Sequence, residues 1–339
     1  MTNVIGKLTG ARSRDVLVGP RLGVDVSVVR IDNSRVMILS SDPVSFIPSI
    51  GPNASARMSV YEIASDVATS GISPMYAMID LNLPPQLSDK SLTEYWESFH
   101  ASCIELGLSI VGGHTGRFEG CDYSVIGGAT LWTFCGPNDY VTSMMAKDGD
   151  DIVLTKSAAY GATSVLTRAF PRTVRKALGS YLFDRAWKYF PKSNTVQDAV
   201  TAARIGLHER GVTAMHDATE GGVVSGLLEL AEASSLGGTV SLGDIPISDE
   251  TQRLCEFFRI DPLVSLGEGS LIITCKPDRT KRIVDNLHSK GIQATSIGKL
   301  SSGIRGIRGV SASGRVALQY PTRDPYWGAY WKAVQKGWF

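Results

Sequence analysis

The sequence predicts a two-domain protein of the mixed α/β (α+β) class, and three observations support this prediction. Strands rich in β-branched residues are interrupted by two amphipathic helices in the first half. Longer helices alternate with strands in the second half. A polar turn over residues 147–150 separates the halves, and 339 residues leave room for two domains with a sizeable core. We therefore expect domains over residues 1–148 and 149–310, followed by an aromatic-rich tail over 311–339.

Four strands are expected in the first domain. Residues 23–31 and 36–40 are predicted to pair as a hairpin, because β-branched residues crowd both sides of the polar turn between them. A short apolar strand then ends in the run Gly112–Gly116, and a longer strand covers residues 123–134.

Two helices are expected between these strands. Residues 54–70 carry apolar side chains at three- and four-residue spacing, and Gly71 ends the segment. Residues 92–106 form the second helix, because the sequence from Ser91 has the spacing of a capping box and Gly107 follows the last turn.

The second half begins with a strand at Asp151–Thr155. Helices are expected over residues 161–170, 195–210, 221–236, 249–259 and 278–290. Further strands are expected near residues 213–215, 239–242, 270–275 and 292–299.

Composition narrows the class of protein. Hydrophobic residues make up 43% of the chain and charged residues 20%, which is typical of a globular protein. The formal net charge of +1 gives no general attraction to nucleic acid, so we expect no nucleic-acid partner. No run of 18 apolar residues and no signal-peptide pattern occurs, so no membrane association is expected and the cytoplasm is the expected location. The five cysteines form no CxxC pair and are interpreted as free thiols.

Asp25, Asp42 and Asp66 are the first candidates for chemistry. They lie within or after apolar strands, or within an apolar helix face. A buried carboxylate is costly without a partner, and Mg²⁺ with nucleotide phosphates is a natural one because this ion takes hard oxygen ligands. The alternative for each acid is a turn cap or a surface ion pair.

A glycine-rich run supplies the next candidate. Gly112-Gly113-His114-Thr115 follows a strand, and its backbone N–H groups could approach phosphates while Thr115 offers a hydroxyl ligand. A glycine turn in a hairpin explains the run equally well.

The second half contains acids next to turns. The run Met215–Gly222 leads from a strand into a helix and places His216, Asp217 and Thr219 on the connection. Helix N-termini bind anions, but Asp217 or Thr219 could equally cap the helix. Glu268, directly before a glycine and a strand, offers a further carboxylate, with a plain hairpin turn as the alternative.

Together these pieces resemble one superfamily of proteins. It joins aminoimidazole ribonucleotide (AIR) synthase, the hydrogenase expression/formation protein HypE, selenophosphate synthetase and thiamine-monophosphate kinase. Each piece alone is unspecific, but their order along the chain is specific; the pieces are GVDVSVV, Ser41-Asp42, Ser65-Asp66, GGHT, DATEGG and LGEG. Residues 217–222 are most similar to the D-P-T-R-G-G motif of the HypE branch.

The resemblance implies a two-domain AIR synthase-like fold, in which an N-terminal mixed β-sheet forms a homodimer and binds ATP, and an α/β domain follows. It implies ATP and Mg²⁺ as cofactors, with Asp25, Asp42 and Asp66 as metal and phosphate ligands and the GGHT run at the nucleotide. His216, Asp217 and Glu268 match positions on the substrate side and are the candidate catalytic residues.

The activity that the resemblance implies is phosphoryl transfer from ATP to a carbonyl or amide oxygen of a small molecule or a protein-borne group. Two residues depart from the family pattern: His114 stands where an acid is common, and Glu220 replaces the arginine of D-P-T-R-G-G. A small-molecule kinase of the thiamine-monophosphate type and a catalytically silent maturation scaffold are therefore kept as alternatives.

Three further features need an explanation. Residues 168–192 carry seven basic residues against one acid and could bind an anion or form a solvated helical face. Seven aromatic residues in 320–339 are expected to pack on the protein's own core or a dimer surface, although a partner-binding tail is an alternative. The cysteine nearest the C-terminal end is Cys275, which is expected to be an inert core residue, so we expect no HypE-like modification of a terminal cysteine.

Overall fold

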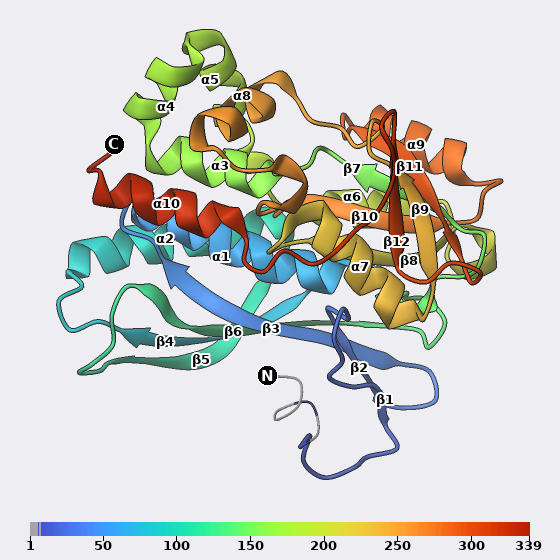
Figure 1. Ribbon diagram of the computed structural model, residues 1–339. Helices are drawn as coiled ribbons and strands as arrows, with labels where there is room; N and C mark the ends of the chain where they lie inside the picture. The colour runs from blue at the N-terminus through green and yellow to red at the C-terminus, as the bar shows by residue number, and fades with distance from the viewer. Residues whose placement is uncertain (1–5, 7) are drawn as a thin grey trace.

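Helix α1 (Gly51–Ala68) lies between the two β-sheets of the protein and contacts both of them (Figure 1). The structure is a computed structural model and describes residue 6 and residues 8–339. One buried apolar cluster extends from the N-terminal sheet through α1 to the C-terminal sheet, and it includes Val44, Ile63, Met215 and Ile273. The two halves therefore share a hydrophobic core where α1 passes between them.

The N-terminal sheet has six strands in the order β1-β2-β3-β6-β4-β5. Their bounds are Val16–Val18 (β1), Ser27–Arg30 (β2), Val36–Phe46 (β3), Tyr76–Leu83 (β4), Ser109–Arg117 (β5) and Ser124–Cys135 (β6). Neighbouring strands are antiparallel except β4 and β5, which run parallel because α2 (Asp89–Leu106) connects them as a crossover helix. Helices α1 and α2 pack on one face of this sheet.

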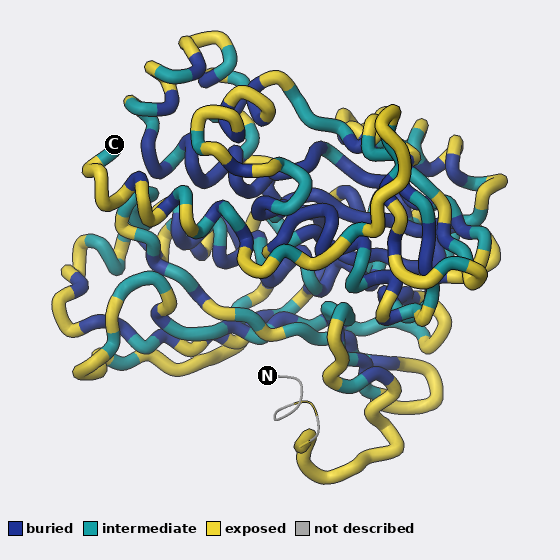
Figure 2. Tube along the Cα trace, in the orientation of Figure 1, coloured by how far each residue is buried: buried dark blue, intermediate teal, exposed yellow. Residues whose placement is uncertain are grey.

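The C-terminal sheet has seven strands in the order β13-β12-β9-β11-β7-β10-β8. Their bounds are Asp151–Thr155 (β7), Val212–Ala218 (β8), Gly237–Ser241 (β9), Ser270–Cys275 (β10), Ala294–Ser301 (β11), Ile307–Ser311 (β12) and Gly314–Ala317 (β13). Every residue of β8 and β10 is buried, so these strands form the centre of the molecule although β8 is the last strand of the sheet (Figure 2).

Eight helices follow in the second half. They are α3 (Tyr160–Ala169), α4 (Pro171–Leu178), α5 (Ser180–Trp187), α6 (Val196–Ala203), α7 (Gly222–Ser234), α8 (Asp249–Phe258), α9 (Thr280–Ser289) and α10 (Pro325–Gln335). None of the helices in the described residues combines the length and the apolar character that crossing a membrane requires.

The predicted mixed α/β class and most of the predicted elements are confirmed. Three strands are longer than predicted. β8 runs from Val212 to Ala218, so His216 and Asp217 lie in the strand and not on the connection after it. β3 continues through Asp42 to Phe46, because β6 pairs with its whole length. Pro43 is tolerated in this strand because β2 pairs only with residues 36–39, so no partner on that side needs the missing N–H. β5 continues through the glycine run to Arg117, because β4 supplies a parallel partner for it.

Two helix ends also differ from the predictions. Ser88, and not Ser91, is the N-cap of α2: its hydroxyl accepts a hydrogen bond from the backbone N–H of Ser91. Helix α6 ends at Ala203, and a separate 3-10 turn, His208–Arg210, precedes β8.

The sequence prediction missed β1, β4, α4, α5, α10 and the β12–β13 hairpin. The hairpin adds to the edge of the C-terminal sheet by parallel pairing of β12 with β9, so residues 311–317 belong with that sheet and not with the tail. The tail itself packs on the protein's own core, as predicted: Tyr326 and Tyr330 are buried, and the carbonyl of Phe339 accepts a hydrogen bond from Thr173.

Candidate functional site

Six carboxylates from both halves of the chain gather around α1. Asp42 comes from β3 of the N-terminal sheet, and Asp217 comes from β8 of the C-terminal sheet. The other four are Glu62 and Asp66 on α1, Asp25 on the segment before β2, and Glu268 directly before β10. We call this group the carboxylate cluster.

The pKa values show how closely these acids lie. Burial, with the charges of Asp42 and Asp217 added, raises the pKa of Glu62 to about 8. Burial and the neighbouring Asp25 raise the pKa of Asp217 to about 8, and burial alone raises that of Asp42 to about 6. The pKa values of Asp66 and Glu268 are raised well above the usual range by burial and by the other members of the cluster. The raised pKa values disfavour the ionised forms of these acids, and a bound cation would favour them again.

The side chains of Asp42 and Asp66 point into the same space. The Ser40 hydroxyl donates a hydrogen bond of 2.9 Å to Asp66 Oδ2, so this face of β3 is turned toward α1. Asp42 follows Ser40 by two residues and therefore lies on the same face of the strand. Neither acid is a turn cap, since Asp42 lies inside β3 and Asp66 inside α1; the turn-cap alternative is wrong for both.

Asp25 is held by His216. Its Oδ1 lies 2.6 Å from His216 Nδ1, while Nε2 of the same ring lies 2.9 Å from Glu229 Oε2 on α7. Burial opposes a charge on the imidazole, but the two carboxylates outweigh it and raise the pKa of His216 well above its usual value. The raised pKa favours the imidazolium form, in which the His216 ring joins Asp25 of the N-terminal segment to Glu229 of α7.

Gly23 allows the Asp25 segment to approach this closely. Its φ is +71°, and a Cβ at this position would lie 2.5 Å from the backbone carbonyl oxygen of Glu229. Any side chain here would push the segment away from α7, and the contact between Asp25 and His216 would be lost.

The turn between β8 and α7 is braced by the C-terminal helix. Asp217 is a strand residue, 1% exposed, and the N-cap of α7 is Gly221, so the alternative that Asp217 or Thr219 caps the helix is wrong. The N–H of Gly221 donates to Asp324 Oδ2 at 2.8 Å. The indole Nε1 of Trp327 donates to Glu220 Oε1 at 2.7 Å.

Two of the carboxylates present a free oxygen. Asp25 Oδ2 and Asp217 Oδ2 are buried and have no hydrogen-bond partner among the described residues. Asp25 and Asp217 each place a carboxylate oxygen within 4.8 Å of the other and of the His216 ring, whose two nitrogens face Asp25 and Glu229. Unpartnered carboxylate oxygens in an acidic cluster are the ligand type that Mg²⁺ takes, so the residues present fit this ion.

The glycine run lies away from the cluster. One row of paired residues crosses four strands, from His114 on β5 through Asp80 on β4 and Gly128 on β6 to Pro43 on β3. Pro43 is the neighbour of Asp42. Three strand spacings of ~4.8 Å place the run about 14 Å from Asp42 within one chain. Close packing also explains why residue 113 is a glycine, because a Cβ there would lie 1.8 Å from the carbonyl oxygen of Ile79.

Sequence reasoning missed Glu62, Glu229 and the partner of Glu220. Glu62 could have been found, because it precedes Asp66 by four residues and so lies on the same helix face. Glu229 and Trp327 could not, since only tertiary packing brings them to His216 and Glu220.

The cysteines take no part in the cluster. All five are free, as predicted, and Cys275 is fully buried in β10. Burial raises the pKa of its thiol to about 11.

The fold and the site define a two-domain α/β protein with a cluster of acidic side chains between its sheets. Residues 23–132 match the N-terminal domain of AIR synthase related proteins, and residues 147–309 match the C-terminal domain. The chain belongs to the AIR synthase related family, as the ordered motifs predicted.

Relatives within this family are enzymes. The chain is 25% identical to carbamoyl dehydratase HypE of Azotobacter vinelandii over 270 residues, which cover 77% of this chain and 74% of that protein. It is 25% identical to selenide, water dikinase of Methanococcus maripaludis over 323 residues, 91% of this chain and 94% of that protein. The prediction of an enzyme family is thus confirmed.

Solved structures share the fold. Hydrogenase maturation protein HypE in complex with ATP has a TM-score of 0.71 at 21% identity, and the match covers 95% of this chain and 91% of that one. AaThiL complexed with AMPPCP and TMP has a TM-score of 0.68 at 18% identity, with 86% and 88% covered.

Proposed function

We propose that the protein is an ATP- and Mg²⁺-dependent enzyme that transfers a phosphoryl group to a carbonyl or amide oxygen of a small molecule or a protein-borne group. The observation that carries this proposal is the carboxylate cluster, whose acids need a cation and include two unpartnered buried oxygens. Its relatives include a carbamoyl dehydratase and a protein solved in complex with ATP, which supports the nucleotide.

The residues of the site have different proposed roles. Asp25, Asp42, Asp66 and Asp217 would hold the metal, and Glu62 and Glu268 would add negative charge around it. Mg-ATP supplies the phosphoryl group and neutralises the acids. The ion pair of His216 with Asp25 ties the N-terminal segment to the C-terminal domain. The assignment of His216, Asp217 and Glu268 to the substrate side stays a prediction. Contact of the nucleotide with Gly112, Gly113, His114 and Thr115 stays a prediction.

Calorimetry with a non-hydrolysable ATP analogue tests this assignment. We expect binding that requires Mg²⁺ and that is weakened at least about tenfold in Asp42→Asn and Asp66→Asn, because each removes a charged ligand. Glu97→Gln, on the exposed face of α2, is the matched control and should bind as the wild type does. Thermal unfolding of each variant separates lost ligation from lost folding. No binding by folded wild-type protein at millimolar nucleotide overturns the proposal.

A kinase of the thiamine-monophosphate type is the second candidate, supported by the shared fold with AaThiL. Phosphorus NMR separates the two reactions, since a kinase leaves the phosphate on its product whereas an activating enzyme releases it. Nucleotide binding without ADP release for any amide or sugar-phosphate substrate would instead favour a silent scaffold.

We further propose a homodimer through the face of the N-terminal sheet opposite α1 and α2. Met78 on β4 is 49% exposed and Val111 on β5 is 53% exposed, while Leu39, Trp132 and Tyr76 form one row across β3, β6 and β4. An apolar sheet face of this kind is self-complementary in a twofold pair. Met78→Asp should convert a dimer into a monomer in sedimentation velocity; an unchanged sedimentation coefficient contradicts this interface.

A further inference from the structure

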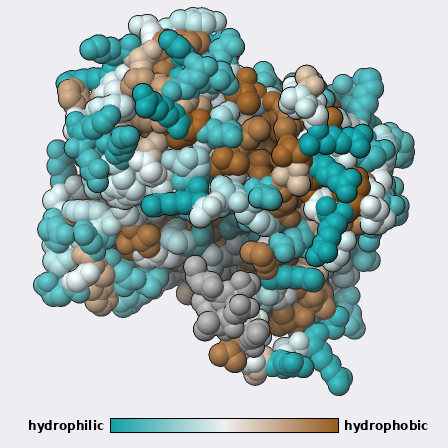
Figure 3. Space-filling model, in the orientation of Figure 1, coloured by the Kyte–Doolittle hydropathy of each residue, from teal (hydrophilic) through white to brown (hydrophobic). Residues whose placement is uncertain are grey.

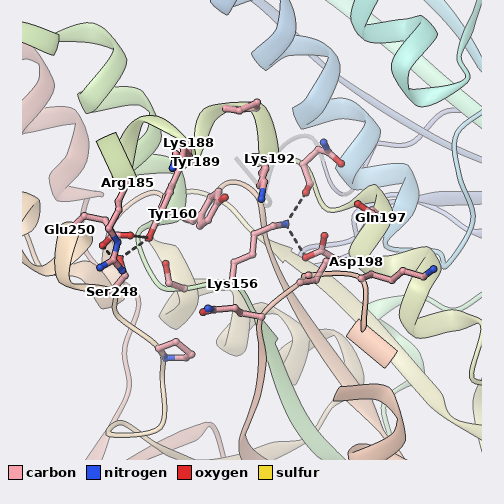
Figure 4. Close-up of a pocket in the computed structure, with 18 of the residues that line it drawn as sticks. Lys156, Tyr160, Arg185, Lys188, Tyr189, Lys192, Gln197, Asp198, Ser248 and Glu250 are labelled. Atoms are coloured by element: carbon pink, nitrogen blue, oxygen red, sulfur yellow. Dashed lines mark hydrogen bonds and ion pairs between the residues drawn. The ribbon is translucent and has the colours of Figure 1, made fainter. Parts of the chain in front are cut away.

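A cavity that includes none of the acids of the carboxylate cluster adjoins the β7–α3 connection. It has a volume of ≈ 630 Å³ and lies between α5, α6 and the connections that precede α8 and β11 (Figure 4). Tyr160 lines this cavity, whereas its neighbour Gly161 packs against Glu268 of the carboxylate cluster. The two sites are therefore separated by one short stretch of backbone.

The floor of the cavity is a fixed polar framework. Lys156 Nζ donates to Asp198 Oδ1 at 2.8 Å and to the backbone oxygens of Asn194 and Gly269. These three bonds use all of its donors, and the pair is nearly buried, with side chains 11% and 3% exposed. Lys156 therefore holds the walls together and is not itself free to bind a ligand.

The acids that line the cavity are all engaged with cations of the protein. Asp198 pairs with Lys156, and Glu105 pairs with Arg57 at 3.2 Å. Glu250 lies 2.9 Å from Arg185, whose second contact is Asp249 at 3.8 Å. Figure 4 shows this second group on the wall opposite Lys156. Three cations thus pair with the four acids of the lining and offset all but one of its negative charges.

Three lysines of the lining remain uncompensated. Lys188, Lys192 and Lys290 face the cavity and have no ion-pair partner among the described residues. Figure 4 shows Lys188 and Lys192 on the side above Lys156. The rest of the basic segment is used differently: Arg168 stacks on Trp187, and Arg175 stacks on Phe183. Figure 3 shows hydrophilic side chains along the outer rim of α4 and α5.

We propose that this cavity binds a small phosphate- or carboxylate-bearing molecule, at a site separate from the carboxylate cluster. Its volume is in the range of small-molecule sites, and three lysines without an ion-pair partner among the described residues line it, while each of its acids already contacts a cation of the protein. The lysines act by charge and hydrogen bonding to the anion, so the affinity decreases with salt.

Calorimetric titration with pyrophosphate and with citrate, both without Mg²⁺, tests the proposal and distinguishes the two anion types. We expect one of the probes to bind to the wild type, with the Kd of the double variant Lys188→Ala, Lys192→Ala about tenfold higher. Lys176→Ala, in the same basic segment but outside the cavity, is the matched control and should bind as the wild type does. Binding should also persist in Asp42→Asn, which separates this site from the proposed nucleotide site.

Two outcomes overturn the proposal. One is that neither probe binds to the folded wild type at 50 mM salt. The other is that binding is the same in the double variant and is lost in Asp42→Asn, which would place the anion at the carboxylate cluster.

Discussion

Glu220 and Trp327 lie 107 positions apart and are joined by a hydrogen bond of 2.7 Å from the indole Nε1 to the carboxylate Oε1. With the bond from Gly221 to Asp324, it fixes α10 to the turn that follows Asp217. The carboxylate at position 220, which departs from the arginine of the related motif, thus has a partner within the chain.

Trp327→Phe should lower the free energy of unfolding by about 1 kcal/mol, because it removes this hydrogen bond to a charged group while keeping an aromatic ring. Denaturant unfolding measures the change. Trp331→Phe, on an exposed part of the same helix, should leave the stability unchanged within about 0.5 kcal/mol. Equal losses in the two variants would contradict a specific role of Trp327.

Glu62→Gln should make the metal-free protein more stable by about 1 kcal/mol at pH 8.5, because one like charge leaves the carboxylate cluster. The same variant should bind the Mg-nucleotide more weakly. Thermal unfolding in EDTA and calorimetry measure the two effects, with Glu97→Gln as the control. A variant that is less stable without metal would show that Glu62 has a packing role instead.

His216→Ala should destabilise the protein by about 3 kcal/mol, because Asp25 and Glu229 lose the cation between them. Chemical denaturation measures the loss. His100→Ala, on the exposed side of α2, should change the stability by less than about 0.5 kcal/mol. A loss no larger than that of the control would mean that the imidazolium contributes nothing.

Stability without metal should fall as the pH rises from about 5 to 9. Asp42, Glu62 and Asp217 have folded-state pKa values of about 6, 8 and 8, above their ordinary values of 3.8, 4.5 and 3.8. The folded state binds these protons more tightly than the unfolded state does. Their contribution to the free energy of unfolding is therefore complete below pH ~4 and is lost as the pH rises through the folded-state pKa values. Melting curves in EDTA test this, and Mg²⁺ should restore more stability at pH 8.5 than at pH 6. A flat profile would contradict it.

Cys275 should resist modification in the native protein. Burial raises the pKa of its thiol to about 11, and those of Cys103 and Cys255 to about 12. Peptide mass spectrometry after iodoacetamide at pH 8 should show alkylation of the partly exposed Cys121 first, and of Cys275 only after denaturation. A carbamoyl or cyano adduct on any cysteine after incubation with ATP and a carbamoyl donor would contradict the prediction that the chain does not modify itself.

The sequence by itself determined the mixed α/β class, most helices and strands, and the acids Asp25, Asp42, Asp66, Asp217 and Glu268. These features depend on local periodicity and on short motifs, which are present in the order of residues along the chain. Glu62 could also have been predicted from the sequence, because helical spacing alone places it beside Asp66.

Only the tertiary structure decided which partner each charge has. The motif at residues 217–222 does not reveal that α10 returns to bond Glu220, nor that His216 takes up Asp25, since those contacts join segments more than 100 residues apart. Within the basic segment, Arg168 and Arg175 stack on aromatic rings while Lys188 and Lys192 line a cavity, a division that the sequence does not show. The physical reason is that charge pairing and burial depend on distances through space, which the packing of both sheets around α1 sets.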